Sequence, residues 1–250
     1  GCASCLLNPI SLMNLLIETV LLDLNNPRNV IGRTKGPFMV PDAYYEQVGL
    51  VPNVIFPSGA LVRDGRLEVY YGATDTYCAV ATIPLDNLLK SITDTEKHGL
   101  TRFPGNPIIT PRPGCSWEAK GTFNPAAIES GDKIHILYRA VSDTDVSTVG
   151  YANSHDGLSI DERSDKPVYF PRANFERRGD AMSNYGCEDP RLMKIGERIF
   201  MAYTAYDGTT PRVAMTSIGE KEFLDKKWGA WTEPQVITPE GVVNKDAAIL

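Results

Sequence analysis

Two carboxylic acids and a guanidinium flank a rigid proline in the segment Glu188-Asp189-Pro190-Arg191, which lies between Cys187 and an apolar run. A carboxyl group in a fixed position can donate a proton to a leaving group, and a neighbouring cation can stabilise developing negative charge. A purely structural ion pair is the alternative interpretation. The segment is therefore a candidate site for acid catalysis.

A second set of polar residues recurs beside prolines and tyrosines that repeat along the chain. Its members begin repeated segments or follow repeated tyrosines: Asn53, Asn124, Glu188, Asp189, Lys245, Asp75, Asp143, Asp207 and Arg139. Amide, carboxylate and cationic groups around one cavity can bind a polyhydroxylated ligand through many directed hydrogen bonds. The alternative is that the asparagines and aspartates are turn residues and that Lys245 is a solvated lysine.

The residue patterns typical of metal sites, catalytic triads and phosphate-binding loops do not occur in this sequence. The histidines, His98, His135 and His155, stand singly, without metal-ligand or catalytic-triad spacing, and no glycine-rich phosphate loop is present. Five scattered cysteines favour reduced thiols over a disulfide framework, and Cys2 and Cys5 form a CxxC without a second pair. The sequence predicts no metal and no cofactor.

Three segments share one pattern and span residues 56–75, 123–143 and 188–208. In each copy a proline precedes a tyrosine by 13 residues, with a glycine turn between them: Pro57, Gly65 and Tyr70; Pro125, Gly131 and Tyr138; Pro190, Gly196 and Tyr203. A fourth copy begins at Lys245. Each copy is typical of a β-hairpin, and a further apolar strand follows at 78–83, 148–152 or 212–218.

Repeats of this length with about four strands each are typical of a β-propeller. Short helices are expected only at 84–92 and 220–228. We therefore predict an all-β fold, an incomplete propeller of three to four blades. A β-sandwich is the alternative. In a propeller the inner strands line a central channel, so equivalent residues of successive repeats should meet around its axis.

The composition indicates which partners to expect. With 25 basic and 31 acidic residues the net charge is −6, so no positive field attracts nucleic acid or an anionic membrane. Residues 1–22 are apolar but interrupted and lack a basic segment, which predicts neither a membrane span nor a signal peptide. We expect a cytoplasmic protein, and a homo-oligomer is compatible with the sequence. The chain has no initiator methionine and stops inside an apolar run, so we expect a segment of a longer protein.

The motifs GLVPNVIFPSGALV, LEVYYGATD, FNPAAI, ILYRA, GCEDPRL, YTAYDG, PRVA and NKDAAIL resemble glycoside hydrolase family 130, the mannoside phosphorylases and related hydrolases. The resemblance spans roughly residues 21–93 and 104–250. It implies a five-bladed β-propeller that acts on mannose-containing or related β-linked glycosides. Residues 1–99 resemble the closing blades of one copy and residues 100–250 the opening blades of another, as at the junction of a tandem or permuted member.

The resemblance also implies roles for individual residues. Asp189 matches the family's catalytic acid, which is thought to act through a sugar hydroxyl, and Asn124, Arg139 and Asp75 match sugar-binding residues. Arg191 and Asp207 join the predicted substrate-binding set, and Lys245 matches a phosphate contact. The predicted function is inverting phosphorolysis of a β-linked oligosaccharide, with phosphate as co-substrate and nucleophile. An inverting hydrolase and a non-catalytic carbohydrate-binding propeller remain the alternatives. The isolated segment should be aggregation-prone and inactive because its ring is open.

Overall fold

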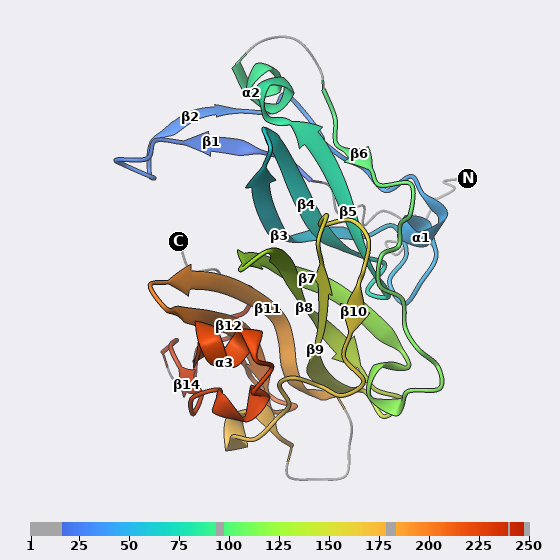
Figure 1. Ribbon diagram of the computed structural model, residues 1–250, viewed down its shortest axis with the longest axis vertical. Coiled ribbons are helices and arrows are strands. Elements are labelled where there is room, and N and C mark those ends of the chain that lie inside the picture. The colour runs from blue at the N-terminus through green and yellow to red at the C-terminus, as the bar shows by residue number, and fades with distance from the viewer. Residues whose placement is uncertain (1–16, 94–97, 179–183, 240, 248–250) are drawn as a thin grey trace, which may run out of the picture.

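The computed structural model describes residues 17–93, 98–178, 184–239 and 241–247, which fold mainly as antiparallel β-sheet (Figure 1). Cys2 and Cys5 lie outside the described residues. The helical segments are short: α1 (Tyr44–Gln47), α2 (Leu85–Thr93) and α3 (Glu220–Leu224), and the 3-10 turns η1 (Ser116–Glu118), η2 (Asn174–Glu176) and η3 (Trp228–Ala230). No helix in the described ranges is long and apolar enough to cross a membrane. The prediction of an all-β chain is confirmed.

Three units of four antiparallel strands coincide with the sequence repeats, and a parallel pairing joins the second and third units into one eight-stranded sheet. The first unit contains β3 (Ile55–Arg63), β4 (Arg66–Ala73), β5 (Tyr77–Pro84) and β6 (Thr101–Arg102). The second contains β7 (Gly121–Ser130), β8 (Lys133–Val141), β9 (Val146–Ser154) and β10 (Glu162–Arg163). The third contains β11 (Tyr185–Ile195), β12 (Arg198–Tyr206), β13 (Pro211–Gly219) and β14 (Gln235–Val236). A hairpin of β1 (Val20–Leu22) and β2 (Val30–Arg33) precedes them.

Each long hairpin turns at the glycine that the repeat predicts. Gly65, Gly131 and Gly196 lie in two-residue loops with φ of 71°, 64° and 60°, a region that favours glycine. The bulge in β3 lies later along its strand than the bulges in β7 and β11. Pro57 therefore pairs with Tyr71, whereas Pro125 and Pro190 lie within the bulges of their own strands.

The first strands of the three units lie next to one another (Figure 1). Strand β7 contacts both β3 and β11, and β3 also contacts β11. In a propeller the first strands of the blades surround an axis, and these contacts are compatible with that prediction. The strands of the described ranges do not close into a ring, so the five-bladed propeller stays a prediction. The division into sections 1–99 and 100–250 is also untested.

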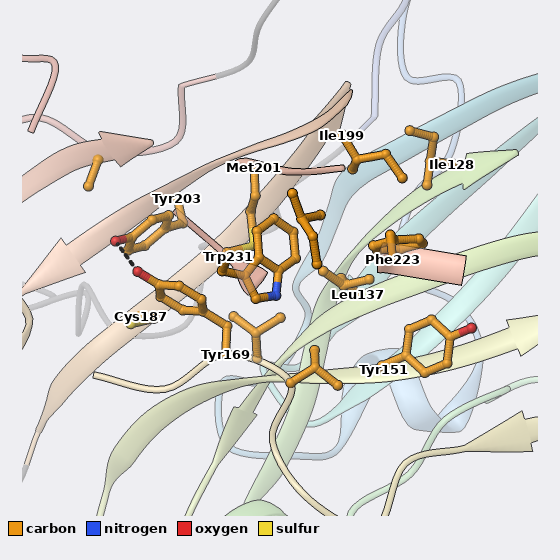
Figure 2. Packing of buried hydrophobic residues seen from close by; sticks show 14 of the residues in the cluster. Ile128, Leu137, Tyr151, Tyr169, Cys187, Ile199, Met201, Tyr203, Phe223 and Trp231 are labelled. Carbon is orange, nitrogen blue, oxygen red and sulfur yellow. Dashed lines mark hydrogen bonds between the residues drawn. The ribbon is translucent and has the colours of Figure 1, made fainter. Parts of the chain in front are cut away.

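The largest cores lie within the units and between neighbours. In the core of Figure 2, Leu137 and Tyr151 of the second unit pack with Met201 and Tyr203 of the third, in one cluster with Trp231. The hydroxyl groups of Tyr169 and Tyr203 point toward each other at 3.0 Å (Figure 2). Close packing of these large side chains joins the second and third units into one body.

A buried glutamate before each unit is a repeated feature that the sequence analysis missed. Glu46, Glu118 and Glu176 are fully buried, and each accepts a hydrogen bond from a tyrosine on the second strand of the unit that follows: Tyr71, Tyr138 and Tyr203. Arg102 also binds Glu46, and Arg112 and Arg163 bind Glu118. The glutamates anchor the linker before each unit to that unit.

We expect the substitution Glu118→Gln to destabilise the fold by about 3–5 kcal/mol, because it leaves Arg112 and Arg163 without their buried anion. Urea unfolding of the full-length protein measures this loss. The control Glu129→Gln removes an exposed carboxylate that has only a 3.8 Å contact with Arg63, and should change stability by no more than about 0.5 kcal/mol. Equal effects of the two substitutions would refute the anchoring role.

Candidate active site

The proline-containing bulges of β7 and β11 turn two polar side chains out of their strands. Asn124 and Asp189 each precede a proline and have φ of 50° and 51°. Asparagine and aspartate tolerate this left-handed region better than most residues, and a bulge redirects its side chain. The two side chains meet, because Asn124 Nδ2 donates a 2.7 Å hydrogen bond to Asp189 Oδ1. Both residues are buried.

Gly72 of β4 makes room for Asn124. A Cβ atom at position 72 would lie 2.2 Å from Asn124 Oδ1 and 2.8 Å from its backbone nitrogen. Because the second of these atoms belongs to the backbone, a side chain could be accommodated only by moving β7. The glycine of the YYGATD motif therefore sets the position of Asn124.

Arg139 lies at the centre of a group of carboxylates. It donates a 2.8 Å hydrogen bond to Glu188 Oε1, and its Nη1 lies 3.5 Å from Asp189 Oδ1. Its guanidinium also covers the ring of Phe123 at 5.0 Å and donates to Ser147 Oγ. Burial acts to lower the pKa of Arg139, but the charges of Asp189, Glu188 and Asp75 outweigh burial and raise it.

These side chains line a pocket of about 240 Å³ between the units. Its walls include residues from both sections of the chain: Val51, Val54, Phe56, Asp75, Phe123, Asn124, Arg139, Asp189, Lys245 and Asp246. Burial raises the pKa of Asp75, an effect that the charge of Arg139 opposes. Burial likewise raises the pKa of Glu188, again against Arg139. The pocket combines buried carboxyls with cations and aromatic rings.

Five of the predicted site residues line this one pocket: Asp75, Asn124, Arg139, Asp189 and Lys245. Asp75 comes from residues 1–99 and Asp189 from residues 100–250, so the two sections contribute to the same pocket. Arg191 lies at its edge, where its guanidinium is 5.7 Å from the ring of Phe56 and burial lowers its pKa.

Asp207 lies elsewhere. It accepts hydrogen bonds from the backbone of Thr209 and Thr210 and pairs with Arg212 at 2.7 Å. It borders a separate depression of about 520 Å³ with Phe175. Asp207 therefore acts as a turn residue here, and its predicted role in substrate binding stays untested. Asp143 is exposed, and Asn53 is an exposed turn residue with φ of 61°.

Phe56, Phe123, Glu188 and Asp246 also line or border the pocket, although the sequence analysis gave them no individual role. One signal could have identified Phe56, since it precedes Pro57 as Asn124 precedes Pro125 and Asp189 precedes Pro190. The described residues contain no cluster of histidine, cysteine and acidic side chains suited to a metal ion.

The described residues form an all-β fold with a pocket lined by polar, charged and aromatic side chains. A family model for glycoside hydrolase family 130, described as β-1,4-mannooligosaccharide phosphorylase, matches residues 15–94 and 101–229. The chain therefore belongs to glycoside hydrolase family 130.

The sequence is also similar to individual members of the mannoside phosphorylases. β-1,2-Mannobiose phosphorylase of Thermoanaerobacter sp. (strain X514) is 33% identical over 172 residues, which make up 60% of this chain and 50% of that protein. 1,2-β-Oligomannan phosphorylase of the same strain is 42% identical over 72 residues, 29% of this chain and 24% of that protein. The chain thus spans 50% of the length of the first relative and 24% of the second.

Several solved structures have a similar fold. α-L-Arabinofuranosidase from Lactobacillus brevis superposes with a TM-score of 0.53 and 16% identity, covering 82% of this chain and 60% of that chain. At this identity the similarity concerns the fold alone.

Proposed function

We propose that the full-length protein is an inverting glycoside phosphorylase of β-mannosides or related β-linked oligosaccharides. The observation that supports this proposal is the joint placement of Asp189, Asn124, Arg139, Asp75 and Lys245 around one pocket. The two relatives from Thermoanaerobacter are named as phosphorylases of β-1,2-linked mannosides, which favours the same class of substrate.

The contacts of Asp189 distinguish its two carboxyl oxygens. Asn124 and Arg139 both present N–H groups to Oδ1, so Oδ1 acts as the acceptor. In the proposed reaction Oδ2 passes the proton to the leaving oxygen, directly or through a sugar hydroxyl. Asp75 and Arg139 offer hydrogen bonds to the sugar ring, which the rings of Phe56 and Phe123 can cover.

Phosphate is the nucleophile in this proposal, so no second carboxylate is needed to activate water. Lys245 at the pocket can hold the phosphate dianion as it attacks the anomeric carbon. Hydrolysis is the second candidate, because the carboxylate of Asp75 lies in the same pocket as Asp189 and could activate a water molecule.

Products formed with and without inorganic phosphate test the proposal. The full-length protein is incubated with β-linked mannobioses, and the products are followed by ³¹P and ¹H NMR. We expect an α-mannose 1-phosphate, formed only when phosphate is present. Free mannose formed without phosphate would show that the protein is a hydrolase and not a phosphorylase. Binding of the disaccharide without any product would indicate a non-catalytic carbohydrate-binding protein.

A further inference from the structure

The bulges of β7 and β11 leave corresponding residues out of the strand pairing. In β7 these residues are Asn124 and Pro125, and in β11 they are Asp189 and Pro190. The first residue of each pair carries a side chain of the candidate site, and the second is a proline, which has no backbone N–H. Carbonyl groups at such a bulge need partners outside the regular ladder.

Strand β3 supplies the partner for the bulge of β7. Ser58 is buried, and its Oγ donates a 2.9 Å hydrogen bond to the carbonyl oxygen of Pro125. The next residue, Gly59, lies against the same backbone, since a Cβ atom there would be 2.9 Å from the Pro125 oxygen and 2.8 Å from the nitrogen of Ala127. Contacts from β3 therefore hold the backbone that carries Asn124.

Arg191 supplies the partner for the bulge of β11. Its Nη1 donates a hydrogen bond of 3.1 Å to the carbonyl oxygen of Pro190 and one of 3.4 Å to that of Asp189. One guanidinium therefore bridges the carbonyl groups of both residues that the pairing omits. The same guanidinium lies 5.7 Å from the centre of the Phe56 ring, within the range of a cation–π interaction.

The surroundings of Arg191 favour this contact with the ring. Phe56 and Arg191 are both half-buried. Burial acts first to lower the pKa of Arg191, whereas the charges of Asp189 and Asp246 act to raise it. A cation–π interaction is stronger where water is excluded, so the ring replaces part of the hydration that the guanidinium has lost. Without the ring, Arg191 should leave the two carbonyl groups for solvent.

We propose that Phe56 is a positioning residue for Asp189 and that it acts through Arg191. The ring holds the guanidinium, and the guanidinium holds the backbone of the bulge that carries Asp189. This role rests on the proposed phosphorolysis, in which Asp189 transfers the proton. Strand β3 thereby acts on both bulges, through Ser58 on that of β7 and through Phe56 on that of β11.

The NMR signals of Arg191 test the contact without any need for activity. The full-length protein is labelled with ¹⁵N-arginine, and the Arg191 side-chain signals are assigned by their loss in Arg191→Lys. We expect resolved Nη–H signals in the wild type, because hydrogen bonds to two carbonyl groups restrict rotation about the Cζ–Nη bond. In Phe56→Leu these signals should broaden beyond detection. Their absence in the wild type, or unchanged signals in Phe56→Leu, would overturn the proposal.

Steady-state kinetics test the role in positioning. We expect Phe56→Leu to lower kcat by about 10- to 10²-fold while the KM for the disaccharide changes less than about threefold, because a small displacement of a catalytic group is enough to slow the reaction. Phe56→Tyr keeps the aromatic face and should keep kcat within about threefold of the wild type. A loss that appears in KM alone would indicate a direct contact with the sugar and would overturn the positioning role.

A double-mutant cycle shows whether Phe56 acts through Arg191. Once the guanidinium is removed the ring has nothing to hold, so Phe56→Leu should add no more than about twofold to the loss of kcat in Arg191→Met. The control Phe170→Leu makes the same substitution at an exposed ring outside the lining of the pocket and should leave kcat unchanged.

Two further outcomes of these experiments are distinguishable. Losses of kcat in Phe56→Leu and Arg191→Met that multiply in the double variant would overturn the proposal, because they would show that the two side chains act independently. A wild-type protein that makes no sugar phosphate would refute the proposed function, whereas the Arg191 signals would still decide whether Phe56 holds the guanidinium.

Discussion

Asp189→Asn should reduce turnover by about 10²–10⁴-fold while sugar binding stays nearly normal. The amide oxygen of the new side chain can still accept from Asn124 and Arg139, so the shape of the pocket is kept. Only the transferable proton is lost. Steady-state kinetics give turnover, and calorimetric titration with the disaccharide gives affinity.

A matched control shows whether the loss of turnover is specific to an aspartate that lines the pocket. Asp143 follows a repeat tyrosine, as Asp75 does, but is exposed and lies outside the lining of the pocket. Asp143→Asn should retain wild-type turnover. If Asp189→Asn also turned over substrate at the wild-type rate, Asp189 would not be the proton donor.

Arg139→Met should destabilise the fold by about 3–5 kcal/mol, because it leaves buried carboxylates without their cation. Glu188 and Asp189 lose a direct partner, and Asp75 loses an attractive charge. The substitution should also abolish measurable sugar binding, since the guanidinium lies in the pocket wall. Urea unfolding at neutral pH measures the loss in stability.

The loss should depend on pH in a defined direction. Burial raises the pKa of Asp75 and Glu188, so acidification protonates these groups early and relieves their repulsion in the variant. The difference between wild type and Arg139→Met should therefore shrink as the pH falls. Arg66→Met serves as control, since Arg66 is exposed and donates to Thr82. A difference that is constant with pH would show that lost packing, rather than charge, causes the effect.

The hairpins of the three units could be predicted because local chemistry determines them. Alternating apolar residues and a glycine at each turn predict the same two-residue loops that the structure shows at Gly65, Gly131 and Gly196. The meeting of Asn124 with Asp189 was also predictable, since both precede a repeat proline and repeats of a propeller converge.

Residues whose spacing or backbone conformation differs between repeats could not be found from the repeat pattern. Glu46, Glu118 and Glu176 precede their unit's proline by different numbers of residues, so a search at constant spacing does not find them. In the fourth repeat Asp246, and not Lys245, has the left-handed backbone conformation of Asn124 and Asp189. Backbone conformation, rather than side-chain polarity, therefore shows which residue corresponds to them. Asp75 and Asp207 both follow a repeat tyrosine, but Asp75 does so after five residues and Asp207 after four. Turn geometry directs Asp207 toward Thr209 and Arg212.

We expect the two sections of the chain to build one sugar site. A crystal structure of full-length Asp189→Asn with a β-linked mannobiose and phosphate tests it most directly. We predict one mannose ring in contact with Asp75, Asn124 and Arg139 together, and phosphate beside Lys245. A sugar ring bound away from Asp75, or bound in a pocket that excludes position 189, would contradict this account.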